Sequence, residues 1–196
     1  MVTKEINYTD YPPALRRLIR RMNGDIDRLS QQLESGDITV SAWFDAMMQL
    51  LEDFYPAAWM AGQNDTDLSP LAQADIQRQL DVQRDFLENF ASEIRATGWI
   101  PTYPSRARMY GTSLTAPYSN GDIVRQVGRV LPLPAMPTEG TQCLSNCKCR
   151  WRIEQLSGDG NFDCYWEINS AEQCQTCIER RRQWYPLQIR NNEVVL

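Results

Sequence analysis

The stretch from residue 69 to residue 98, SPLAQADIQRQLDVQRDFLENFASEIRATG, predicts the class of the fold. Ser69 followed by Pro70 is typical of a helix start, because serine caps the first amides and proline lacks an amide that the first turn would leave unpaired. Gly98 is expected to end the helix. Between these limits, apolar residues recur at helical spacing: Leu71, Ile76, Leu80, Phe86, Leu87, Phe90 and Ile94.

A second amphipathic helix is predicted near the start of the chain. Thr9 or Asp10 can cap it, and Gly36 is expected to end it because glycine is common just after a helix. Its apolar face has the same three-and-four spacing: Leu15, Leu18, Ile19, Met22, Ile26, Leu29 and Leu33.

A third helix is predicted between these two, starting at Thr39 or Ser41. Its apolar face consists of Trp43, Met47, Leu50, Leu51 and Phe54. Pro56 removes a backbone donor and is expected to kink or stop the helix, whose tail closes at Gly62. Three such helices can bury their apolar faces against one another, so residues 1–100 are predicted to form an antiparallel helical bundle.

The composition changes after Gly98, where proline, glycine, serine and tyrosine become frequent. Residues 101–138 are therefore expected to be an irregular connector or docking segment, with short helices around 105–110 and 122–130. Within LPLPAMPTEG, residues 131–140, three prolines favour an extended, polyproline-like backbone. We expect the domain boundary in this linker.

All six cysteines lie beyond the linker, in the segment 139–196: Cys143, Cys147, Cys149, Cys164, Cys174 and Cys177. Two close groups of cysteines separated by a longer stretch are typical of a zinc ribbon or knuckle, in which each group supplies two thiolates to one ion. A segment this short has a thin core, so a metal or disulfides would stabilise it. We expect a small α+β zinc-ribbon-like module. Together with the helical bundle before it, this makes the chain mainly α.

The predicted zinc ligands are Cys143, Cys147, Cys174 and Cys177. Cys149 is the substitute for either of the first two. Because the chain contains no histidine, any zinc site must consist mainly of thiolates. If residues 147–151 form a strand, Cys147, Cys149 and Trp151 share one face. Cys164 is interpreted as a buried strand residue.

Two other uses of the cysteines remain open. Six cysteines also permit a disulfide framework, which a particle released from the cell can acquire. A redox-active pair of Cys174 and Cys177 is less favoured, because no βαβ pattern surrounds it.

Basic residues flank the cysteines in two groups: Lys148, Arg150 and Arg152, then Arg180, Arg181 and Arg182. They are candidates for contact with nucleic-acid phosphates or with an acidic partner, and Trp151 and Trp184 would then offer stacking surfaces. Because nearby acids bring the module close to neutral, we favour a solvated face or a protein partner. The net charge of −5 also argues against a protein that coats nucleic acid.

Several function classes are disfavoured. Without histidine the chain lacks the commonest general base and every Ser-His or Cys-His pair, and it has no glycine-rich phosphate loop, so we expect neither an enzyme nor a small-molecule substrate. No apolar run is long enough for a membrane span. The first residues lack the apolar region of a secretory signal, which favours folding in the cytoplasm of the producing cell.

The segment GTQCLSNCKCRW, residues 140–151, resembles the NCxC signature that closes the phage Mu F-like minor head protein (head morphogenesis) family. The order of three helices, an ARMYG segment, a proline-rich linker and this signature is similar to many phage minor head sequences. Two later segments, CYWEI and EQCQTCIERRRQWYPL, resemble the rest of the family's zinc-like module. The resemblance covers much of the chain loosely and residues 139–189 most closely.

This resemblance implies a structural virion protein of a tailed phage, assembled in the host cytoplasm. Its expected partners are capsid or portal proteins, with packaged DNA as a further contact. Two departures matter, since Leu144 and Ser145 stand where relatives often have histidine, and Gln173 precedes the second cysteine pair. A mixed His/Cys ligand set is thereby excluded. The chain is short for the family, so a cement or decoration role also stays open. The alternative is a zinc-ribbon nucleic-acid-binding protein.

Overall fold

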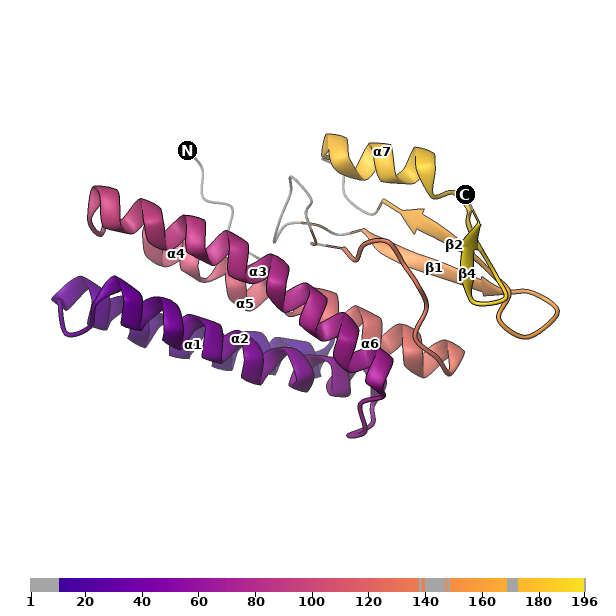
Figure 1. Ribbon diagram of the computed structural model, residues 1–196, viewed down its shortest axis with the longest axis horizontal. Coiled ribbons are helices and arrows are strands. Elements are labelled where there is room, and N and C mark those ends of the chain that lie inside the picture. The colour runs from indigo at the N-terminus through magenta and orange to yellow at the C-terminus, as the bar shows by residue number, and fades with distance from the viewer. Residues whose placement is uncertain (1–10, 138, 140–146, 148, 169–172, 196) are drawn as a thin grey trace.

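The computed structural model describes residues 11–137, 139, 147, 149–168 and 173–195. Its helices are α1 (Pro13–Ser35), α2 (Val40–Gln63), α3 (Pro70–Thr97), α4 (Tyr103–Ala107), α5 (Met109–Thr112), α6 (Thr115–Val127) and α7 (Gln175–Gln183). Its strands are β1 (Arg150–Gln155), β2 (Phe162–Glu167), β3 (Leu187–Arg190) and β4 (Glu193–Val195). A helical bundle with a small antiparallel sheet at one end confirms the predicted fold class (Figure 1).

The predicted ends of the three long helices agree closely with the structure. Gly36 follows α1 in the left-handed region, with φ of 80°. The side chains of Thr39 and Ser69 accept hydrogen bonds from the backbone amides of Ala42 and Ala72, each at 3.2 Å, and so cap α2 and α3. The expected caps of α1, Thr9 and Asp10, lie outside the described residues.

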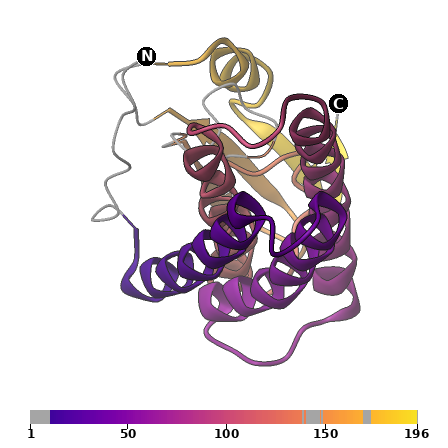
Figure 2. The same ribbon diagram turned by 90° about the vertical axis from the view of Figure 1, so that its left-hand side faces the viewer.

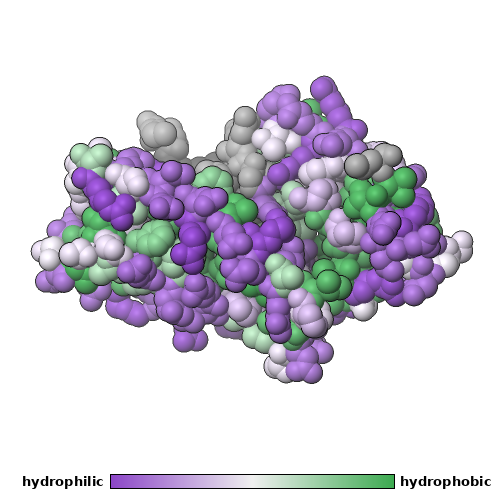
Figure 3. Space-filling model, in the orientation of Figure 1, coloured by the Kyte–Doolittle hydropathy of each residue, from purple (hydrophilic) through white to green (hydrophobic). Residues whose placement is uncertain are grey.

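Two details of these helices sharpen or correct the prediction. Pro56 lies inside α2 and does not stop it, and the helix continues to Gln63, one residue beyond the predicted close at Gly62, with Ala58 and Trp59 buried in its last turns. On α3, Leu71 and Phe86 were predicted to face the core, yet they are 67% and 46% exposed. Figure 3 draws one face of the molecule, where hydrophobic areas interrupt a mostly hydrophilic surface.

Aromatic side chains form the centre of the bundle core. The ring of Trp43 packs edge-on against Phe90, with centroids 5.5 Å apart, and Phe90 packs in the same way against Tyr103 at 5.1 Å. Trp99 contacts both Trp43 and Tyr103. Edge-to-face pairs add to the stabilisation from burial alone, so this cluster ties α4 to α2 and α3.

Residues 101–138 contain more helix than expected. Helices α4 and α5 overlap the short helix predicted around 105–110, and α6 begins seven residues before the one predicted at 122–130. Helix α6 packs closely along α2 at two glycines. A Cβ atom on Gly62 would overlap the carbonyl oxygen of Tyr118, and one on Gly121 would overlap that of Trp59. The backbones of α2 and α6 can come this close only because neither glycine has a side chain.

Helix α6 belongs to two hydrophobic cores. Leu114, just before it, is buried in the bundle core, whereas Ala116 and Ile123 are buried in a second core under the sheet. Leu131 and Met136 of the proline-rich linker are also buried in this second core. The linker is irregular, as expected, but it is packed, and the core of the cysteine-rich module begins at α6.

The sheet has the order β1-β2-β3-β4 with every neighbouring pair antiparallel. Its buried face includes Trp151, opposite Trp166 in the register, and Cys164, opposite Ile153. Trp151, Trp166 and Trp184 contact one another with ring centroids 5.2 to 5.7 Å apart. Helix α7 packs near β2, beside this tryptophan cluster (Figure 1).

Candidate metal centre

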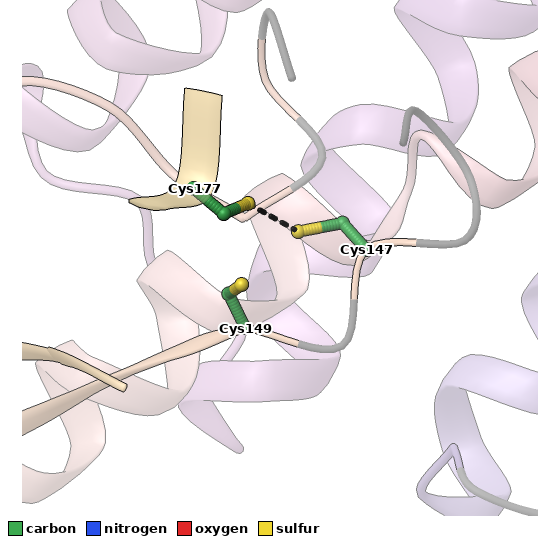
Figure 4. A group of neighbouring side chains, drawn as sticks. All are labelled: Cys147, Cys149 and Cys177. Atoms are coloured by element: carbon green, nitrogen blue, oxygen red, sulfur yellow. Dashed lines mark hydrogen bonds between the residues drawn. The ribbon is translucent and has the colours of Figure 1, made fainter. Parts of the chain in front are cut away.

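Three cysteine side chains meet in the second core: Cys147, Cys149 and Cys177. Their Sγ atoms all lie within 4.8 Å of one another, and those of Cys147 and Cys177 are 3.9 Å apart. The side chains are 4%, 8% and 1% exposed. Figure 4 shows the three sulfur atoms pointing toward one another from two separate segments. The cluster can therefore hold a metal ion.

Local backbone patterns explain how the three thiols reach one point. Cys149 directly precedes β1 and Cys147 lies two residues before it. Both are buried in the same core as Trp151, as the period of two predicts. Cys177 is the third residue of α7. A helix start favours a thiolate, because the backbone amides there are unpaired and the helix dipole is positive.

The sulfur separations suit a metal better than a disulfide. In a tetrahedral zinc site with Zn–S bonds of about 2.3 Å, neighbouring sulfurs lie about 3.8 Å apart. The 3.9 Å between Cys147 and Cys177 matches this spacing, whereas a disulfide requires about 2.05 Å. No disulfide joins any two of the five cysteines that the structure describes.

The remaining cysteines are placed differently. Cys143 lies outside the described residues. Cys174 is the N-cap residue of α7, half-buried, and is not part of the three-cysteine cluster. Cys149, predicted only as a substitute ligand, belongs to the cluster. Cys164 is a buried β2 residue, as predicted, and lies apart from the cluster.

The pKa values of two thiols in this core, Cys149 and Cys164, are raised. Contact with the thiol of Cys147 raises the pKa of Cys149, and burial raises it further. Burial raises the pKa of Cys164 to about 12, with a smaller contribution from the charge of Asp163. A metal ion bound at the cluster would have to displace the thiol protons, as it does in all thiolate sites.

The predicted contact residues are mostly engaged within the molecule. Arg150 and Arg152 both donate to Glu167, at 2.9 and 2.8 Å, and Arg152 also pairs with Glu154. Glu167 was not predicted as a partner of these arginines. It lies two residues beyond Tyr165 on β2, so both side chains are on the outer face of the sheet.

The α7 arginines lie over aromatic rings. Arg180 covers Trp166 and Trp184, and Arg181 covers Tyr185. Arg182 is exposed, and Lys148 lies outside the described residues.

The two tryptophans expected to stack on bases are buried instead. Trp151 and Trp184 lie against each other with ring centroids 5.6 Å apart, and Trp151 donates a hydrogen bond to the carbonyl of Ala135 at 2.9 Å. Neither ring has a face open to a nucleic-acid base. Their role is to fill the core between the linker, the sheet and α7.

None of the helices that the structure describes combines the length and the apolar character needed to cross a bilayer. No model of a known protein family, no curated protein and no solved structure matches the chain.

Proposed function

We propose that this chain is a structural, non-catalytic virion protein of a tailed phage, a minor head or capsid accessory component that stabilises capsid or portal contacts. The observation that carries the proposal is the NCxC segment itself. This segment resembles the minor head signature. It also contributes Cys147 and Cys149, two of the three residues of the cysteine cluster.

The build of the molecule fits such a role. Two cores share α6, and polar links tie the linker to the bundle, where Arg78 of α3 pairs with Glu139 and Glu139 accepts from the amide of Met136 at 2.9 Å. A protein that holds two neighbours at a fixed separation needs this kind of rigidity more than it needs a cleft.

We further propose that the metal is zinc, bound by thiolates alone. Thiolate sites also suit copper(I) and iron–sulfur clusters, but zinc is the usual ion of structural sites with two spaced cysteine groups. Cys147, Cys149 and Cys177 supply three ligands. Cys143 or Cys174 supplies the fourth.

Metal analysis tests the zinc proposal. Protein purified without added metal should contain about one zinc per chain, and thiol counting in denaturant with a chelator should find six reactive thiols. A chain with three disulfides and no metal would refute the zinc site and support the disulfide framework.

The virion role is tested separately. Particles of the phage that encodes the chain should contain it after gradient purification, at a fixed copy number per portal or per capsid, as measured by quantitative mass spectrometry. Its absence from intact particles would overturn the structural role and leave the metal site untouched.

The alternative of a zinc-ribbon nucleic-acid binder has less support. Its proposed arginines pair with Glu167 and Glu154 or lie over aromatic rings, and its proposed stacking residues are buried. Contact with phosphates through the module would require these internal pairs to break.

A further inference from the structure

A dense group of arginines covers the outer side of the first turns of α1. It consists of Arg16, Arg17, Arg20 and Arg21, which we call the arginine face. Arg17, Arg20 and Arg21 are exposed and Arg16 is half-buried. Figure 2 shows α1, in indigo, at the edge of the bundle.

Among the described residues, no carboxylate neutralises the arginine face, whereas several other arginines have an ion-pair partner. Arg28, Arg84 and Arg125, for example, pair with Asp25, Glu52 and Asp122. By contrast, no ion pair joins the arginine face to any carboxylate among the described residues. One member, Arg21, lies over an aromatic ring, with its guanidinium 5.7 Å from the ring centroid of Phe54.

The position of these charges is unfavourable for the helix itself. The first turn of α1 contains no acidic residue, so nothing there offsets the positive end of the helix dipole. Arg16 and Arg20, and likewise Arg17 and Arg21, are four residues apart and therefore repel each other along the helix. Like charges that repel along a helix, with no ion pair to a carboxylate among the described residues, are typical of a functional surface.

The composition of the face indicates the class of partner. A protein interface needs an apolar anchor at its centre, and the described part of α1 contributes none of the large exposed hydrophobic residues of the molecule. Contact with a phosphate backbone needs only charge and hydrogen-bond donors, and arginine offers a planar fork that matches phosphate oxygens.

We propose that the arginine face of α1 binds the phosphate backbone of nucleic acid without sequence preference. The contact is separate from the cysteine-rich module. It does not depend on the virion role, and it allows a chain of net charge −5 to approach nucleic acid through one side of one helix.

The test compares two fourfold variants of the full-length, zinc-loaded protein. In the first, each residue of the arginine face is changed to glutamine, which preserves helix propensity. The matched control has the same change of net charge on other exposed helical arginines: Arg28→Gln, Arg84→Gln, Arg95→Gln and Arg125→Gln. Fluorescence anisotropy with a labelled duplex of mixed sequence is measured from 25 to 200 mM salt, and circular dichroism checks that both variants remain folded.

We expect wild-type binding that weakens steeply with salt. Loss of the arginine face should reduce the slope of log K against log salt by about 3 to 4, since each phosphate contact contributes about 0.9, and should weaken binding at least tenfold at low salt. The control should stay within about twofold of wild type. Changing the four residues to lysine should preserve the slope.

Three results would overturn the proposal: no binding of duplex by the wild type at 25 mM salt, equal losses in both variants, or binding of polyglutamate in preference to duplex. The last result would assign the face to an acidic protein instead.

Discussion

The cysteines of the second core occupy two kinds of environment. Cys147, Cys149 and Cys177 lie at a point where three sulfurs converge, whereas Cys164 is surrounded by apolar strand residues. The same thiol group is therefore a candidate metal ligand in the first place and a small hydrophobic residue in the second.

Serine substitution should separate these roles. Cys147→Ser, Cys149→Ser and Cys177→Ser should each lose zinc and lower the thermal midpoint by at least about 6 °C, because loss of about 3 kcal/mol shifts the midpoint of a chain this size by 2 to 4 °C per kcal/mol. Cys164→Ala should keep its zinc. Metal content and calorimetry measure both effects, and a Cys149→Ser protein with full zinc content would remove Cys149 from the ligand set.

The raised pKa of Cys164 has a direct chemical consequence. With a pKa of about 12 and complete burial, this thiol stays protonated at pH 8 and should not react with iodoacetamide in the native protein. Peptide mapping should find Cys164 alkylated only after unfolding. Modification at native rates similar to those of an exposed thiol would show that β2 opens readily.

At this scale the sequence predicted the residue types better than their grouping. The alternation of Cys147, Cys149 and Trp151 is a local property of an extended backbone, so it could be read directly. The choice of Cys149 over Cys174 depends on where α7 lies relative to β1. That position is set by tertiary packing of the tryptophan cluster, which no local pattern encodes.

Among the elements, the close contact between α2 and α6 leaves no room for a methyl group at Gly121. Gly121→Ala should reduce stability by about 1–3 kcal/mol, because the new Cβ would overlap the carbonyl oxygen of Trp59 and the helices would have to separate. Gly24→Ala is the matched control, since nothing lies within 4 Å of its Cβ position in α1. The control should gain about 0.5–1 kcal/mol from its better helix propensity. Chemical denaturation of both variants measures the difference, and equal stabilities would contradict the close helix contact.

The elements that were predicted well are those with strong local signals. Ser69 with Pro70, Thr39, Gly36 and Gly98 each mark a helix end by their own chemistry. Helix α6 was largely missed because it contains proline, asparagine and glycine, which are poor helix formers. Tertiary packing on α2 requires the glycine that propensity disfavours.

For the whole molecule, sharing α6 means that the helical body and the cysteine-rich module are not independent. A fragment of residues 1–137 would expose Ala116, Ile123, Leu131 and Met136, which the sheet now covers. We expect this fragment to bind a hydrophobic dye and to unfold at a lower temperature than the full chain. A fragment with the thermal midpoint of the bundle in the intact protein would show instead that the boundary at residue 139 separates two self-sufficient domains.

The sharing of α6 by the two cores also has a consequence for binding at two sites. Arg129, just beyond α6, pairs with Asp159 of the β1–β2 loop and donates to Asn192 of the β3–β4 turn, so the far end of the sheet is anchored as well. If one partner binds the module, these contacts would hold α1 in a defined orientation toward a second partner. The second attachment is then intramolecular, with a high effective concentration, and two weak contacts can add up to one durable attachment.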